Sequence, residues 1–339
     1  EGVYQNCEIW VNGTSVGTTI ADANGDWGFT TAAQSDGPKS ITAAQTDIAG
    51  NVSGPSAAFG ITIDTQVAAP TIESVGDDTG QSNTDRVTAD NTLDIRGKAE
   101  AGASVDVRID GVSVGTAIAD INGNWRLTTT AQNDGVKSIT ATQTDVAGNV
   151  SQPSVPYSMT IDTGALAPTI DSVTNDTGVD GDRITSDSTL TVQGSAEVGA
   201  TVEVRVDGVA VGTAIADGTG RWTFTTTALS DGSRSITAKQ TDVAGNVSAL
   251  SPSYDVTIDT QVVAPTIESV GTDTGISSTD RITSDSTLDI RGKAESGATV
   301  QVSIDGNPVG VALADINGKW VFTTASLADG LRSITVCQT

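Results

Sequence analysis

Short runs of alternating apolar and polar residues, separated by turn signals, recur along the whole chain. Between residues 67 and 163 these runs predict seven strands, at Pro70–Val75, Thr92–Lys98, Ser104–Ile109, Val112–Ala119, Asn124–Thr130, Val136–Thr144 and Ser154–Ile161. The Asp-Gly and Asn-Gly pairs between strands suit the positive φ angles of tight hairpins. Because no segment shows helical periodicity, the pattern predicts a β-sandwich of immunoglobulin (Ig) type, without the Cys…Trp…Cys arrangement of antibody domains.

The same pattern repeats with a constant period. Tryptophan recurs at Trp27, Trp125, Trp222 and Trp320, at steps of 98, 97 and 98 residues. This period is too long for a solenoid unit and suits one small domain. We therefore expect an all-β tandem array of Ig-like β-sandwich domains that forms an extended rod. Its units are a partial repeat at 1–66, which lacks its opening strands, complete repeats at 67–163 and 164–261, and a partial repeat at 262–339, which lacks its last strand.

Alternation along the strands separates core positions from surface positions. Trp125 and Leu127 share one face of their strand, so the repeated tryptophans are expected to anchor the cores, and a carbohydrate-stacking platform is the alternative. Trp10 falls on an outward face, where it could stack on a sugar. Cys7 takes an inward position and Cys337 a mixed one. They lie in the first and last units, so we expect free thiols, with an intermolecular disulfide as the alternative.

Composition and charge exclude several classes of function. The chain has 17 Lys+Arg, 42 Asp+Glu and no His, for a net charge of −25. Phosphate and anionic lipid repel such a chain, and without His there is no Ser-His-Asp triad or His-ligated zinc. No run approaches the roughly 18 apolar residues of a membrane span. Carboxylate pairs can serve a glycosidase, but pairs copied in every repeat indicate a structural role, so we expect no enzyme activity. Because the chain opens at Glu1 without an apolar leader, we expect a fragment.

Acidic residues gather where successive repeats should meet. If strands alternate in direction, the linker Asp after one repeat faces a Glu-x-Gly turn and an Asp-x-Ala-Gly-Asn loop of the next. Carboxylates crowded without basic partners raise one another's pKa unless a cation lies among them, and oxygen ligands select Ca²⁺. We therefore expect Ca²⁺ at three junctions, and the alternative is a tight turn whose Asp and Asn bond their own backbone. The candidate ligands are Asp64, Glu100, Asp145 and Asn149; Asp162, Glu197, Asp242 and Asn246; and Asp259 with Glu295.

A second acidic loop follows the first strand of each repeat. Its carboxylates are further candidate Ca²⁺ ligands, and pairing with Arg86, Arg183 and Arg281 is the alternative. The residues are Asp78, Asp85 and Asp90; Asp176, Asp182 and Asp187; and Asp273, Asp280 and Asp285. The segment from Asp120 to Asn124 lacks the Gly and Glu of an EF-hand loop, and we expect a hairpin turn there.

Two longer phrases resemble a known family. Asp-Arg-Ile-Thr-Ser-Asp-Ser-Thr-Leu at 182–190 and 280–288, and Thr-Asp-x-Ala-Gly-Asn-Val-Ser at 46–53, 144–151 and 241–248, resemble the bacterial immunoglobulin-like (BIg) tandem repeats of giant, type I-secreted, Bap-like or RTX-type non-fimbrial adhesins. The resemblance implies an extracellular, Ca²⁺-stiffened rod on the bacterial surface. Such a rod holds an adhesive tip for attachment to host cells or abiotic surfaces and for biofilm formation. Cysteine is a departure from the family pattern.

Other functions remain open from the sequence. A lectin-like module would bind glycans through the repeats themselves, and exposed aromatic side chains would mark it. An accessory array of an enzyme or of an S-layer protein is a further alternative. In all of these we expect a monomeric rod that binds no nucleic acid and does not insert into a membrane.

Overall fold

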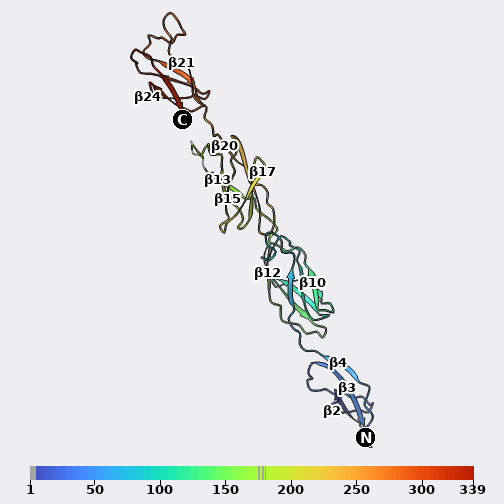
Figure 1. Cartoon of the computed structure of the whole chain (residues 1–339). Coiled ribbons are helices and arrows are strands. Elements are labelled where there is room, and N and C mark those ends of the chain that lie inside the picture. The colour runs from blue at the N-terminus through green and yellow to red at the C-terminus, as the bar shows by residue number, and fades with distance from the viewer. Residues whose placement is uncertain (1–4, 175, 178, 180) are drawn as a thin grey trace.

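The chain forms a row of small β-domains. The computed structural model describes residues 5–174, 176, 177, 179 and 181–339. Figure 1 shows the domains in line, with the two chain ends in the first and last of them. The described residues contain strands and turns and no helix, and so no helix able to cross a membrane. The predicted all-β tandem array is confirmed.

The second repeat shows the complete unit. A three-stranded sheet has the order β10-β7-β5, and a five-stranded sheet has the order β6-β12-β11-β8-β9. The strands are β5 (Thr71–Val75), β6 (Val87–Thr88), β7 (Asp94–Lys98), β8 (Ser104–Ile109), β9 (Val112–Ile118), β10 (Asn124–Thr128), β11 (Gly135–Thr144) and β12 (Tyr157–Ile161). All seven predicted strands are present. The additional strand, β6, lies inside the acidic loop and pairs in parallel with β12.

The third repeat has the same two sheets, ordered β13-β15-β18 and β14-β20-β19-β16-β17. Its strands are β13 (Thr169–Thr174), β14 (Ile184–Thr185), β15 (Thr191–Ser195), β16 (Thr201–Val206), β17 (Val209–Ile215), β18 (Arg221–Thr225), β19 (Gly232–Thr241) and β20 (Tyr254–Ile258). The two sheets enclose one core in each complete repeat, where Leu190, Val204 and Ile236 are fully buried.

The first and last repeats contain part of this unit. The first is a single sheet with the order β2-β1-β3-β4. Its strands are β1 (Asn6–Val11), β2 (Thr14–Ile20), β3 (Gly37–Thr46) and β4 (Phe59–Ile63). The last has the sheets β21-β22-β25 and β24-β23-β26. Its strands are β21 (Thr266–Val270), β22 (Asp289–Lys293), β23 (Thr299–Ile304), β24 (Asn307–Leu313), β25 (Lys319–Thr323) and β26 (Ile334–Gln338).

The repeated tryptophans lie between the two sheets wherever both sheets exist. Trp125, Trp222 and Trp320 are only 1–3% exposed. The expectation that Trp27 anchors a core is wrong, because this side chain is 45% exposed. The described part of the first repeat has one sheet only, so no second sheet covers the ring.

A glycine facing each buried tryptophan allows this close packing. A Cβ on Gly194 would lie 2.0 Å from the Thr169 carbonyl oxygen and 2.6 Å from the Trp222 ring. Gly97 and Gly292 have equivalent contacts. Any side chain here must displace either backbone or the tryptophan.

We predict that Gly194→Ala destabilises the third repeat by about 1–3 kcal/mol, the usual cost of overpacking a core. The matched control is Gly218→Ala in the same repeat, where an added Cβ meets nothing within 4 Å. Hydrogen exchange measured by mass spectrometry on β15 and β18 reports this repeat separately from its neighbours. Equal exchange in the two variants would contradict the packing role of Gly194.

Candidate metal sites at the domain junctions

Carboxylates from two neighbouring repeats converge at two successive junctions. At the first junction, Asp64, Glu100 and Asp145 each place one oxygen within 4.8 Å of the others. At the second junction, Asp162, Glu197 and Asp242 form the same group. The first member of each group belongs to the linker and the other two belong to the repeat that follows. The structure thus brings together the six carboxylates predicted at these two junctions.

Hydrogen bonds within the Asp-x-Ala-Gly-Asn loop orient its aspartate. The Asp145 carboxylate accepts bonds from the backbone N–H of Asn149 (2.8 Å) and from its side-chain amide (2.7 Å). Asp242 accepts the equivalent pair from Asn246, both at 2.8 Å. The turn geometry considered as the alternative is therefore present, in the same loops that face the linker.

The loop asparagines also hold the linkers. Asn149 Nδ2 donates to the Asp64 carbonyl oxygen (3.1 Å), and Asn246 Nδ2 donates to the Asp162 carbonyl oxygen (2.7 Å). In this arrangement each asparagine acts as a donor that joins loop to linker. Its predicted role as an oxygen ligand stays a prediction.

A glutamine, buried at the first two junctions, completes the attachment of each linker to the following repeat. Gln143 Nε2 donates to the Ala68 carbonyl oxygen (2.7 Å), while its Oε1 accepts from the Glu100 N–H (2.8 Å). Gln240 and Gln338 repeat this pattern at the second and third junctions. Sequence reasoning missed these residues. The available signal was a polar residue at an inward position of an alternating strand, since Gln143 is only 2% exposed.

The glutamates fix the linker backbone as well. Glu100 Oε1 accepts from the Ala68 N–H (3.2 Å), and Glu197 Oε1 accepts from the Leu166 N–H (2.8 Å). At the third junction Glu295 Oε1 accepts from the Val263 N–H (2.6 Å). That junction contributes two predicted carboxylates, Asp259 and Glu295, and the structure does not place them in a group of three among the described residues.

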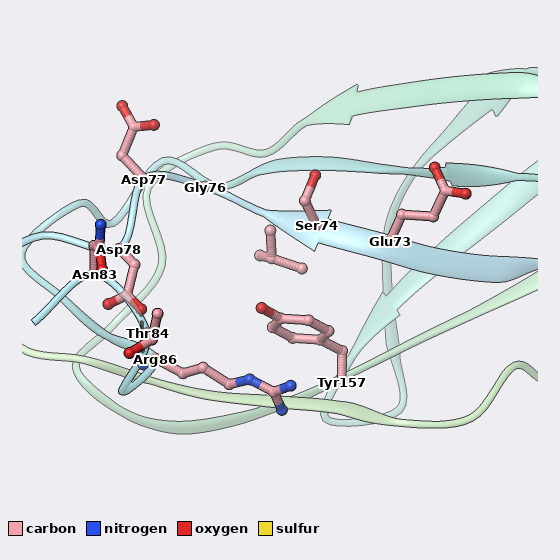
Figure 2. A pocket seen from close by; sticks show the side chains of 10 residues that line it. Glu73, Ser74, Gly76, Asp77, Asp78, Asn83, Thr84, Arg86 and Tyr157 are labelled. Carbon is pink, nitrogen blue, oxygen red and sulfur yellow. Dashed lines mark hydrogen bonds between the residues drawn. The ribbon is translucent and has the colours of Figure 1, made fainter.

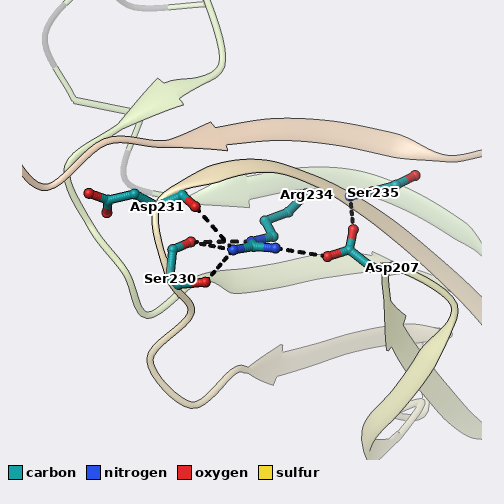
Figure 3. Close-up of polar contacts among 5 residues, drawn as sticks. All are labelled: Asp207, Ser230, Asp231, Arg234 and Ser235. Atoms are coloured by element: carbon teal, nitrogen blue, oxygen red, sulfur yellow. Dashed lines mark hydrogen bonds and ion pairs between the residues drawn. The ribbon is translucent and has the colours of Figure 1, made fainter.

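The preceding repeat holds the other side of each linker. The threonine after each linker aspartate donates its hydroxyl to an aspartate of the preceding repeat: Thr65 to Asp36 (2.8 Å), Thr163 to Asp134 (2.9 Å) and Thr260 to Asp231 (2.8 Å). In the third repeat, Arg234 bonds the carbonyl oxygens of Ser230 and Asp231 and the carboxylate of Asp207 (Figure 3). This arginine therefore bonds the same turn whose Asp231 accepts from Thr260.

The electrostatics of the first junction differ in part from expectation. Asn149, through its side-chain amide, is the main cause of a lowered pKa of Asp145, and backbone N–H groups of the loop contribute. Repulsion among crowded carboxylates was expected to raise the pKa. For Asp145 the hydrogen bonds donated by its own loop have the larger effect, because they stabilise the charged form. No ion pair of the described residues involves any of the six junction carboxylates. Each group thus presents carboxylate oxygens without a basic partner among the described residues.

The donor set fits a hard divalent cation. Three carboxylate oxygens lie close enough for one ion to bridge them, and His and thiolate are absent from both groups. Ca²⁺ prefers oxygen ligands at about 2.3–2.6 Å and tolerates irregular geometry, which suits a site shared by a linker and two loops.

The acidic loops after the first strands are organised differently. Their carboxylates do not form a group of three among the described residues, and most accept bonds from their own loop backbone. Asp78 accepts from the Arg86 N–H, and Asp85 accepts from the Val87 N–H. One oxygen each of Asp78, Asp176 and Asp273 is buried without a hydrogen-bond partner. A cation in these loops stays a prediction.

The loop arginines contact aromatic rings. The Arg86 guanidinium lies 4.5 Å from the centre of the Tyr157 ring, and Arg183 lies 4.4 Å from that of Tyr254. Figure 2 shows Arg86 extending beside Tyr157 in the pocket that Asp78 and Asn83 also line. Since the arginine occupies one face of the tyrosine ring, less of that ring is open for stacking on a sugar.

The other singled-out residues have structural positions. Asp120 accepts from the N–H groups of Asn122 and Asn124, both at 2.8 Å, which confirms the hairpin turn. Cys7 is buried, Cys337 is exposed, and both are free thiols. Trp10 is half-buried on β1.

The fold is that of a tandem array of Ig-like β-sandwiches joined by clamped linkers. The chain belongs to the bacterial Ig-like domain family, whose pattern matches residues 4–65, 66–163, 165–260 and 261–339. A comparison with curated proteins found no match.

Solved structures provide further similarities. A tetra-tandem repeat from the extending region of a large adhesion protein is 20% identical with a TM-score of 0.37, covering 99% of this chain and 87% of that one. Fibronectin(III)-like modules of CbhA from Clostridium thermocellum are 14% identical with a TM-score of 0.28, covering 58% and 93%. The BSP domain of a biofilm-associated protein is 15% identical with a TM-score of 0.22, covering 67% and 43%.

We predict that the first and second junctions each bind one Ca²⁺. In calorimetric titration of the chelator-treated chain, Glu100→Gln should remove one bound ion relative to the parent, and Glu100→Gln with Glu197→Gln should remove two. Both changes keep the oxygen that accepts from the linker N–H. Glu8→Gln, on β1 and outside both groups, is the matched control and should change nothing. An unchanged number of bound ions in the double variant would contradict these sites.

Proposed function

We propose that this chain is a structural extender segment of a bacterial cell-surface adhesin, in which Ca²⁺ stiffens the rod. The segment spaces an adhesive tip from the cell, for attachment to host cells or other surfaces and for biofilm formation. The observation that carries the proposal is the convergence of three carboxylates from two neighbouring repeats at each of two successive junctions. Membership of the bacterial Ig-like domain family and the end-to-end arrangement of the domains support it.

The mechanism is mechanical. Three negative charges within 4.8 Å of one another repel, which favours movement of the linker carboxylate away from the following repeat. A divalent cation attracts all three carboxylates, so the net electrostatic energy of the group becomes favourable. Because the ion is bound by both sides only when the junction is closed, its binding free energy stabilises the closed junction over hinged ones.

The same chemistry supports an extracellular location. Calcium sites of extracellular modules bind with Kd values of about 10⁻⁴–10⁻³ M, and a junction site in that range would fill outside cells, where the ion is plentiful. We propose that the rod is secreted to the bacterial surface, by a type I route, and acts as a monomer. The net charge of −25 opposes contact with anionic lipid and nucleic acid.

We predict that Ca²⁺ stabilises the parent chain against thermal unfolding more than it stabilises Asp162→Asn. At a Ca²⁺ concentration one hundred times Kd, binding at one site adds about 2.7 kcal/mol to the free energy of unfolding. The Asp162→Asn variant should lose the stabilisation that the second junction provides. Asp255→Asn, an exposed aspartate of β20 in the third repeat, is the control and should respond like the parent. Identical Ca²⁺-dependent shifts in Asp162→Asn and the parent would overturn the proposal for this junction.

A further inference from the structure

A second kind of contact lies at the second junction, and it involves no carboxylate oxygen. The acidic loop of the second repeat touches the Asp-x-Ala-Gly-Asn loop of the third. Thr79 Oγ1 donates to the Ala244 carbonyl oxygen (2.8 Å), and the Gln81 N–H donates to the Val243 carbonyl oxygen (3.1 Å). The Gln81 side-chain amide reaches the Gly199 carbonyl oxygen (3.1 Å). We call residues 79–81 the latch and residues 243–245 the seat.

Two glycines allow the latch and the seat to meet. A Cβ on Gly80 would lie 2.1 Å from the Val243 carbonyl oxygen, and a Cβ on Gly245 would lie 3.0 Å from the Gly80 Cα. The corresponding glycine of the fourth repeat, Gly275, and that of the second-repeat loop, Gly148, have nothing within 4 Å. Neither of those loops has a counterpart loop beside it among the described residues, so the close approach requires a latch and a seat together.

Burial shows that the latch covers the seat. Ala244 is 1% exposed and Val243 is half-buried. In the second repeat the corresponding residues are exposed, with Val146 at 83%, and in the first repeat Ile48 is 78% exposed. Residues 1–66 contain no counterpart of the acidic loop, so among the described residues the latch and the seat meet at the second junction.

We propose that the acidic loop is a docking element for the Asp-x-Ala-Gly-Asn loop of the repeat that follows it, and that this contact fixes the second junction without an ion. All of its acceptors are neutral backbone carbonyl oxygens, apart from a long contact to the Thr201 hydroxyl, so removing a cation leaves them intact. The residue at position 81 adjusts the contact. Gln81 donates through its side chain, whereas Val179 and Ile276, at the same position in the third and fourth repeats, cannot.

The latch stands independently of the calcium proposal and makes a different prediction. After chelation the first junction should become mobile, while the second should keep its geometry. Spin labels at Thr18, Thr116 and Thr213 suit this test, because the three are exposed and pair with corresponding residues of β1, β8 and β16. The native thiols are first replaced by Cys7→Val and Cys337→Thr, the residues found at the same positions of the second repeat.

The experiment measures distance distributions by double electron–electron resonance on the full chain, in Ca²⁺ and in excess EDTA. The pair Thr18→Cys with Thr116→Cys spans the first junction, and Thr116→Cys with Thr213→Cys spans the second. In EDTA we expect a narrow distribution across the second junction in the parent and a severalfold broader one in Gly80→Ala. Gly275→Ala, at a matched positive φ in an uncrowded loop, should leave it narrow.

Two results would overturn the latch. One is a broad distribution across the second junction in the parent in EDTA. The other is a narrow distribution in Gly80→Ala in EDTA. Failure of the calcium proposal looks different, because the first junction would then give the same distribution with and without EDTA, whatever the second junction shows.

Discussion

The attachment of each linker to the repeats on both sides is the constraint on which the rest of this structure depends. At the second junction, Thr163 is bonded to the repeat before it, while Leu166 is bonded to Glu197 and Gln240 of the repeat after it. Hydrogen bonds to both repeats restrict the backbone conformation of the linker. This attachment places the linker aspartate beside two carboxylates of the next repeat, where we propose a cation site shared between domains.

The two proposed contacts at a junction, the carboxylate group with its ion and the latch, respond to different conditions. The carboxylate group is electrostatically unfavourable alone and becomes favourable with an ion, so it depends on the medium. The latch consists of neutral hydrogen bonds and close glycine packing, so it depends on the residues of the two loops. At the second junction both contacts occur together, so we propose that its geometry persists when calcium is removed.

Much of the fold could be predicted from alternation and turn chemistry, because both are local properties. The seven strands of the second repeat and the inward position of Trp125 follow from period-two patterning. The six junction carboxylates could be predicted too, because alternating strand directions determine which loops share an end of the sandwich.

The features that sequence reasoning missed depend on tertiary contacts. Trp27 carries the same local pattern as Trp125, but the described residues of its repeat form one sheet, which leaves the ring 45% exposed. The lowered pKa of Asp145 comes from the donors of Asn149, which pattern reading placed among the ligands. The latch depends on how two domains dock, and Gly80 looks like Gly275 until the neighbouring repeat is present.

Small-angle X-ray scattering of the full chain, in Ca²⁺, in EDTA and after Ca²⁺ is restored, tests the central claim most directly. Calcium at the junctions predicts a longer maximum dimension in Ca²⁺, a shorter and broader pair-distance distribution in EDTA, and full recovery when the ion returns. Superimposable scattering curves with and without the chelator would contradict a calcium-stiffened rod.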